Sequence, residues 1–346
     1  MKYLLTFKPL KNFFFGNNKT FSNDYVAHSE YFPQNTQLLG ALKIFLAEQK
    51  GLMHIHKNGR YSNNPASLTK LIGNASSKDY MTNDNLGLIN NISQMFIVNK
   101  SITDAFFPTP FDIEILEKEV NYYELTNIDQ DYFYKNFSVK DVSSQSLAGN
   151  DFWKKYLKKE TLDFTTIHDF DTVFKKHSQV GIGLENKQVV DKAFYVKEDY
   201  NLDSEYLFAC VFDFDETIED GIIQLGAESS LFSLKVSKLE STEIANHTIV
   251  SQFFTQDIQG EKLIAMSDII LNSTHELNTY FSHIPFTKKL AMLQSGNRYT
   301  NSFKGKTLQT NVIPQGSVFY LKSQREILQK GAYNKMGYNQ FIKVKK

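Results

Sequence analysis

The first fifty residues constrain the fold most, because they join an apolar strand to an amphipathic helix. Residues 3–8 alternate between two sets of side chains, which is typical of a strand with one buried face. Apolar residues then recur at helical spacing from Leu38 to Leu46, and Gly51 marks the end of the pattern. Asn35 or Thr36 can cap the first turn of this helix. The chain is therefore expected to begin with a sheet strand followed by a covering helix.

Strands outnumber helices in the later sequence. The clearest alternation of apolar and polar residues lies at 208–214 and 232–236, and short apolar strands are indicated at 290–293, 318–322 and 341–344. A short helix is indicated around Trp153 and Leu157. Helices that appear between many short strands predict an α+β fold, with helices packed on one face of antiparallel sheets.

The length of 346 residues exceeds a usual single core and favours about two domains. Between Gly51 and Lys159 the composition shifts toward Asn, Ser and Lys, with few long apolar runs at first. We therefore predict a first domain over residues 1–165, which carries a long irregular insertion at about 51–159. The second domain is predicted over residues 166–346.

The charge balance argues against non-specific binding of nucleic acid over the whole surface. The chain has 38 basic and 38 acidic residues, so any nucleic-acid site must be a local patch. Aromatic residues make up 14% of the chain, with 29 Phe and 18 Tyr, and their rings could stack on bases. We interpret most of these aromatic residues as members of a Phe-rich core.

The compartment is predicted from two absences in the sequence. Cys210 is the one cysteine, so an intramolecular disulfide or a thiolate metal cluster is excluded. The apolar run at the N-terminus is interrupted at Lys8, and no stretch approaches the ~20 apolar residues of a membrane helix. We expect a cytoplasmic protein without membrane contact.

No stretch of the sequence assembles a catalytic or metal-binding pattern. The candidates considered are the acidic run Asp213, Asp215 and Glu216, the pair His54 and His56, the triplet Thr274-His275-Glu276, and the thiol of Cys210. Each has a plainer structural explanation, such as a solvated strand end, a surface turn or a core thiol. We therefore expect no catalytic residue, no metal site and no cofactor.

One basic loop has the composition of a phosphate-binding segment. Residues 295–306 place Arg298, Lys304 and Lys306 among glycines and small polar residues, with Gly305 between the two lysines. Glycines allow the backbone to approach a phosphate, so that backbone N–H groups add to the charge of the side chains. A mobile surface loop would have the same composition, and the sequence does not decide between them.

Several blocks of the sequence, in order, resemble the RAMP superfamily of CRISPR proteins, and specifically the third subunit of the type III-B (Cmr) effector complex. The blocks are Pro9–Phe21 with Phe32–Lys43, then Phe107–Asp112, then Val180–Leu184 with Ala193–Tyr195, then Leu225–Glu228, and finally Val312–Tyr320. The resemblance spans nearly the whole chain. The sequence departs from the family pattern at His177 and Gln179, where a basic residue is common, and at Ala227, where a second glycine is usual.

The resemblance implies a non-catalytic subunit built of two ferredoxin-like domains, similar to RNA-recognition motifs, with glycine-rich loops. It implies that the chain binds the 5′ tag of the CRISPR RNA, pairs with a large polymerase-like subunit, and contacts neighbouring RAMP backbone subunits. Single-stranded RNA is typically held by phosphate contacts and by bases stacked on aromatic rings. The RNA-binding residues expected on this basis are Lys19, Arg298, Lys304, Gly305 and Lys306 at phosphates, Asn35 and Thr36 at a helix N-terminus, Phe14 or Phe15 against a base, and His177.

Three alternatives stay open. The same fold could serve a CRISPR RNA processing endoribonuclease, with His28 or His177 as the acid or base. The chain could be the equivalent subunit of a type III-A complex. It could also be a scaffold that joins other subunits without touching RNA.

Overall fold

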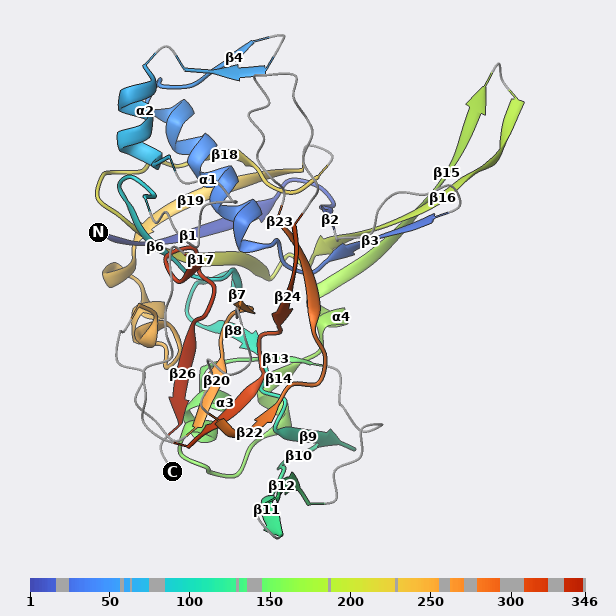
Figure 1. Cartoon of the computed structure of the whole chain (residues 1–346), viewed down its shortest axis with the longest axis vertical. Helices are drawn as coiled ribbons and strands as arrows, with labels where there is room; N and C mark the ends of the chain where they lie inside the picture. The colour runs from blue at the N-terminus through green and yellow to red at the C-terminus, as the bar shows by residue number, and fades with distance from the viewer. Residues whose placement is uncertain are drawn as a thin grey trace.

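The first strand of the chain lies in the middle of the largest sheet. In the computed structural model, β1 (Lys2–Pro9) pairs antiparallel with β17 (Tyr206–Phe214) on one side and with β19 (Leu231–Lys238) on the other (Figure 1). The structure describes residues 1–16, 25–56, 59–62, 64–74, 85–128, 131–135, 145–185, 188–227, 230–254, 262–270, 279–292, 308–322 and 333–344.

The central sheet has nine strands, drawn from distant parts of the chain. Its order is β14 (Ile167–His168), β13 (Leu147–Ala148), β8 (Ala105–Pro108), β7 (Phe96–Asn99), β17, β1, β19 and β18 (Gly221–Gln224), and β6 (Ile89–Ile92) also pairs with β17. Strands from residue 2 to residue 238 thus form one hydrogen-bonded unit.

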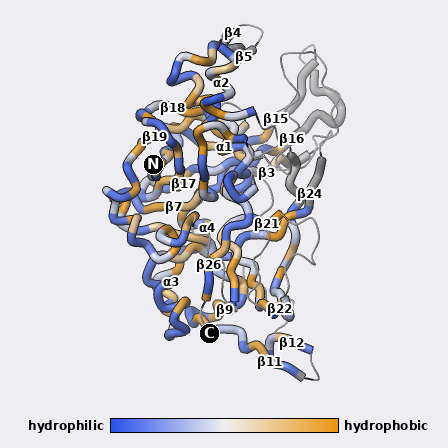
Figure 2. The backbone as a smooth tube through the Cα atoms, turned by 60° about the vertical axis from the view of Figure 1, so that its left-hand side comes forward, coloured by the Kyte–Doolittle hydropathy of each residue, from blue (hydrophilic) through white to orange (hydrophobic). Residues whose placement is uncertain are grey.

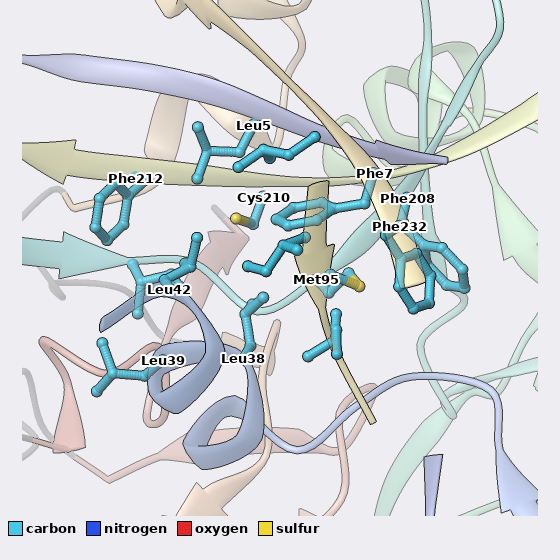
Figure 3. Close-up of a cluster of buried hydrophobic side chains, with 14 of the residues drawn as sticks. Leu5, Phe7, Leu38, Leu39, Leu42, Met95, Phe208, Cys210, Phe212 and Phe232 are labelled. Atoms are coloured by element: carbon cyan, nitrogen blue, oxygen red, sulfur yellow. The ribbon is translucent and has the colours of Figure 1, made fainter. Parts of the chain in front are cut away.

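One face of this sheet packs against α1 (Asn35–Gln49). Phe208, Cys210 and Phe212 point to this face from β17, and Leu38 and Leu42 of α1 meet them (Figure 3). All five side chains are buried. The alternation of β1 and β17 that the sequence predicts is the pattern that fills this core.

The opposite face packs against a second core. Leu4 and Val211 alternate with the residues of the first core and belong to one buried cluster with Trp153 and Tyr156 of α3 (Asn150–Leu157). Strands near the C-terminus complete this layer, because Ile342 belongs to the same cluster. The central sheet is therefore covered on both faces.

A second, smaller sheet projects from the body as a long hairpin. Its order is β15 (Phe174–Glu185), β16 (Gln188–Leu202), β3 (Tyr25–Glu30) and β2 (Phe15–Gly16), and β16 and β3 run parallel. Figure 1 shows β15 and β16 extending away from the rest of the chain. Gly181 lies opposite Tyr195, so two blocks of the family resemblance pair across this hairpin.

The remaining strands form small sheets. The C-terminal ones are β22 (Thr279–His283), β25 (Val318–Leu321), β20 (Lys262–Ala265) and β26 (Phe341–Val344), and a separate sheet of β21 (Ile269–Ile270), β24 (Leu308–Ile313) and β23 (Lys288–Met292). Three hairpins stand by themselves: β4 (His54–His56) with β5 (Gly59–Tyr61), β9 (Ile113–Leu116) with β10 (Glu119–Tyr122), and β11 (Leu125–Ile128) with β12 (Asp131–Tyr134). His54 and His56 thus lie in a hairpin strand.

Helices are few. Besides α1 and α3, the described chain contains α2 (Pro65–Ile72), α4 (Phe170–Val173) and short 3-10 turns at Phe164–Thr166, Leu239–Ser241, Glu243–Asn246 and Val250–Gln252. None of the helices in this part is long and apolar enough to cross a membrane. The predicted cap of α1 is wrong by one residue, because Asn35 is already helical and Gln34 precedes the helix with its backbone N–H donating to Gln37 Oε1 at 3.3 Å.

The predicted α+β class with mostly antiparallel sheets is confirmed. The strands predicted at 208–214, 232–236, 290–293 and 318–322 are also confirmed, and their ends differ by at most a few residues. The segment assigned to an irregular insertion, about 51–159, instead supplies four strands of the central sheet: β6, β7, β8 and β13. The central sheet also joins strands from both sides of residue 165. A division into two ferredoxin-like domains stays a prediction.

Candidate nucleic-acid interface

The base of the β15–β16 hairpin carries a charged cluster on each face of its sheet. Glu198 and Asp199 are consecutive residues of β16, so their side chains point to opposite faces. Each carboxylate is held by a lysine and a histidine from the surrounding strands. The two clusters therefore have the same composition but lie back to back.

On the first face, Glu198 accepts a bond from Lys176 Nζ at 2.7 Å and pairs with Nδ1 of His28 on β3. The hydrogen bond from Lys176 lowers the pKa of Glu198, so the carboxylate stays ionised near neutral pH. Lys176 and His28 are more exposed than the acid between them. The Lys176 ammonium and the His28 ring therefore lie on the solvent side of this cluster.

On the second face, Asp199 lies deeper and holds three groups. Its Oδ1 lies 3.0 Å from His177 Nδ1 and accepts a bond from Asn12 Nδ2 at 3.1 Å, and its Oδ2 lies 3.4 Å from Lys197 Nζ. The Asp199 side chain is 4% exposed, whereas that of His177 is 50% exposed. Lys197 also lies over the ring of Phe14, with Nζ 5.4 Å from its centre.

An aromatic group adjoins the first cluster. The ring of Tyr31 lies 4.7 Å from those of both Phe170 and Tyr200, and Tyr200 is the cross-strand partner of Lys176. Tyr31 and Tyr200 are half-buried. Burial raises the pKa of Tyr31, so its hydroxyl stays neutral and adds no charge that would repel a phosphate. Proteins typically bind single-stranded RNA with partly exposed aromatic rings, on which bases stack, and with nearby cations.

The two histidines of the hairpin base are separated by the sheet. His28 and His177 lie on opposite faces, because their partners Glu198 and Asp199 alternate along one strand. They cannot serve as the acid and the base for one phosphodiester. Among the residues that the structure describes, no three His, Cys, Asp or Glu side chains lie close enough to hold a metal ion. Burial raises the pKa of Cys210, so this thiol stays protonated in the core.

The predicted base-stacking role of Phe14 and Phe15 is not supported by their burial. Phe15 is 0% exposed and stacks on Phe232 at a centroid distance of 5.9 Å, and Phe14 is also buried. The turn at Gly226 packs against this segment, with φ at +93°, and a Cβ there would lie 2.6 Å from the carbonyl oxygen of Phe14 and 3.0 Å from the ring of Phe15. These aromatic residues are core residues, because two blocks of the sequence pack on one another here.

The predicted contacts at the start of α1 are covered by the C-terminal segment. Asn35 is buried, and its Nδ2 lies 2.4 Å from where a Cβ of Gly337 would be, so only glycine fits there. The backbone N–H of Thr36 donates to the hydroxyl of Tyr338 at 3.4 Å. This helix N-terminus is therefore occupied by the protein's own side chains. A phosphate would have to displace them.

The other predicted site residues divide into two groups. His177 is exposed at the base of the hairpin, as an RNA contact requires. Lys19, Arg298, Lys304, Gly305 and Lys306 lie outside the described residues. Their role stays a prediction.

Sequence reasoning missed Lys176, Tyr31 and Tyr200. Tyr31 directly precedes the Phe32 block, but alternation along the chain does not reveal that it meets Tyr200 from a strand 170 residues away. The cross-strand register Lys176 to Tyr200 likewise depends on how β15 and β16 pair. A prediction of the register between β15 and β16 would have brought these residues together.

Comparisons with known proteins give one family. The model of a family described as CRISPR-associated protein (Cas_Cmr3) matches residues 5–345. One chain in a cryo-EM structure of the type III-B Cmr-beta complex bound to cognate target RNA is similar, with 14% identity, a TM-score of 0.55, and coverage of 99% of this chain and 97% of that chain.

A second match is a chain of type III-B Cmr-beta bound to cognate target RNA and AMPPnP, with 15% identity and a TM-score of 0.54. It covers 99% of this chain and 97% of that chain. At these identities the likenesses show a shared fold. No curated protein matches the sequence.

Proposed function

The chain belongs to the Cas_Cmr3 family of CRISPR-associated proteins, and on this premise we propose that it is the subunit that binds the 5′ tag of the CRISPR RNA in a type III-B effector complex. In this proposal it also docks the large polymerase-like subunit and contacts neighbouring RAMP backbone subunits. The observation that carries the proposal is the extent of the family match, which covers residues 5–345. The match also favours the type III-B assignment over the type III-A alternative.

The hairpin base supplies the RNA-binding surface in this proposal. The Lys176 ammonium and the His28 ring lie on the outer side of this cluster, while Glu198 fixes their positions from within. Tyr31 and Tyr200 add aromatic surface on the same face. A nearly neutral protein can hold an RNA strand at one place in this way, because cations release counterions from phosphates locally.

We propose that the subunit is not an enzyme. The separation of His28 and His177 on two faces of the sheet supports this proposal, because general acid–base cleavage of RNA uses two groups at one bond. Incubation of the purified protein with repeat RNA tests it. The binding subunit leaves the RNA intact, and a specific cut that disappears with His28→Ala or His177→Ala would identify the endoribonuclease instead.

The direct test of tag binding compares two sets of variants in the reconstituted complex. Lys176→Ala is expected to weaken binding of tag RNA about fivefold and to reduce the slope of log K against log salt by about one, because one phosphate contact is lost. The triple variant Arg298→Ala, Lys304→Ala and Lys306→Ala is expected to bind tag RNA more weakly than Lys176→Ala does.

The matched control is Lys235→Ala, which removes an exposed lysine that pairs with Asp220 at 2.8 Å on the central sheet. It should leave affinity and salt slope unchanged. If Lys176→Ala and the triple variant both bind tag RNA with wild-type affinity and salt dependence, these residues do not contact the RNA. Crosslinking of the assembled complex to labelled guide RNA then separates an RNA-binding subunit from a scaffold that never touches RNA.

A further inference from the structure

Three exposed aliphatic side chains adjoin at one corner of the central sheet. Ile222 of β18 is 62% exposed, Leu231 of β19 is 46% exposed, and Leu10, directly after β1, is 50% exposed. The backbone N–H of Leu10 donates to the carbonyl oxygen of Leu231 at 2.9 Å, so these two residues continue the pairing of β1 with β19. Ile222 pairs with Ser233, two residues from Leu231, and is therefore its diagonal neighbour. The three side chains form one contiguous apolar patch.

The patch lies on the face of the sheet that points away from α1. Leu231 alternates with Phe232, which lies in the first core, and therefore faces the opposite side. Ile222 alternates with Ile223 of the same core and faces away from α1 for the same reason. In both Figure 1 and Figure 2, β18 and β19 lie side by side above β17. The second core covers the middle of this face, where Leu4 is buried, but not the corner at β18.

The width of the patch fits one helix. It crosses β1, β19 and β18, which is two strand spacings or about 10 Å, and an α-helix is about 10 Å across. On the inner face, α1 packs on the same three strands, where Phe7, Phe232 and Ile223 share a buried cluster with Leu38 (Figure 3). Sheets in layered folds bury both faces. At this corner the described part of the chain supplies a helix on one face only.

The charge beside the patch indicates an acidic partner. Lys8 and Lys11 flank Leu10 in the chain, both are exposed, and neither forms an ion pair with another described residue. A third lysine at the patch, Lys235, is already neutralised by Asp220 at 2.8 Å. The uncompensated charge is therefore positive and attracts carboxylates. The patch itself is aliphatic and offers no ring on which a base could stack, so a protein fits it better than RNA does.

We propose that this patch binds an acidic amphipathic helix of the large polymerase-like subunit. The apolar side of that helix packs on Leu10, Leu231 and Ile222, and its flanking carboxylates lie beside Lys8 and Lys11. Removal of apolar surface from water drives the contact, while the complementary charges raise the association rate. The proposal rests on the proposed function, in which this chain docks the large subunit directly.

The test titrates the labelled full-length chain with the purified large subunit, without RNA, at low and high salt. Ile222→Ser with Leu231→Ser should weaken binding at least tenfold. Lys8→Glu with Lys11→Glu should also weaken it and should flatten its salt dependence. All four side chains are exposed, so the midpoint of thermal unfolding should stay at the wild-type value in both double variants.

Crosslinking in the reconstituted complex identifies the occupant. A photo-crosslinking residue at position 222 should capture one peptide of the large subunit, in which apolar residues recur at helical spacing beside Asp or Glu. Capture of the guide RNA, of a backbone subunit or of a second copy of this chain would overturn the proposal.

The matched controls are Leu116→Ser, which changes an apolar residue that is 55% exposed at the end of β9, and Lys118→Glu, which changes an exposed lysine in the next turn. Both should bind the large subunit as the wild type does. Wild-type binding by both patch variants would overturn the helix site and leave the proposed function standing. If the wild-type chain binds tag RNA but not the large subunit, the docking role in the proposed function fails together with this site.

Discussion

At the scale of single residues, one buried ion pair explains a block that the sequence linked to the family. Asp112 closes the block Phe107–Asp112, and its carboxylate pairs with Lys262 Nζ and accepts a bond from the Tyr156 hydroxyl at 2.6 Å. Lys262 Nζ also lies 2.7 Å from that hydroxyl. The three side chains come from the residue before β9, from α3 and from β20, so the network joins three segments around the second core. Asp112 of this block therefore serves packing of the second core.

Asp112→Ala is therefore expected to destabilise the protein by about 3–5 kcal/mol, because it leaves the Lys262 ammonium buried without its counter-charge. The side chains of Asp112 and Lys262 are 3% and 12% exposed, which makes this loss much larger than that of a surface pair. Urea unfolding of the full chain measures the change. Glu205→Ala, which breaks an exposed pair with Lys100, should cost less than about 1 kcal/mol, and equal effects of the two substitutions would contradict the network's role.

At the scale of elements, the turn of the β9–β10 hairpin adopts an unfavourable backbone conformation. Leu116 pairs with Glu119, so the turn has two residues, and Glu117 and Lys118 both have positive φ, at +46° and +72°. Two-residue turns of this type favour Asn and Gly, which adopt these angles without a steric cost. The sequence contains neither residue there, so the hairpin is held by the packing of its inner face.

Lys118→Gly is expected to raise the free energy of unfolding by about 0.5–1 kcal/mol, because glycine relieves the left-handed strain at φ +72°. Thermal unfolding of the full chain gives the shift. Glu119→Gly, one residue later at the start of β10, should instead lower stability, since glycine weakens a strand and position 119 lies outside the left-handed turn. A lower stability for both variants would show that the turn is unstrained.

At the scale of the whole molecule, the central sheet ties the two halves of the chain together. β1 from the first half is inserted between β17 and β19 from the second, and Leu5, Phe7 and Phe208 are fully buried at that junction. Separation of the halves would expose both sides of a central strand. The topology thus favours one cooperative unit for this sheet.

Fragments 1–165 and 166–346, expressed separately, are therefore expected to lack cooperative unfolding, and mixing them should restore structure if the strands can pair again. Circular dichroism and limited proteolysis measure both outcomes. The intact chain serves as the reference. A fragment 166–346 that unfolds cooperatively by itself would support the two-domain division that length and composition indicate.

The sequence by itself determined several of the strands and the main helix, but not the four strands between residues 51 and 159. The alternation in β1, β17 and β19 and the helical spacing in α1 are local patterns, and each follows from the need to bury one face of an element. The order of short blocks was also enough to indicate the family, since a family is recognised along the chain. The sequence did not determine that Phe14 and Phe15 are buried. The same residue type can stack on an RNA base or pack against another side chain of the protein.

Only the tertiary structure decided what these elements do together. The insertion of β1 between strands 200 residues away, the pairing of Lys176 with Glu198, and the contact of Tyr31 with Tyr200 all depend on strand order and register. Hydrophobic patterning specifies which face of a strand is buried but not which strand lies beside it. For that reason the sequence could not show that the start of α1, one part of the predicted RNA groove, is covered by Tyr338.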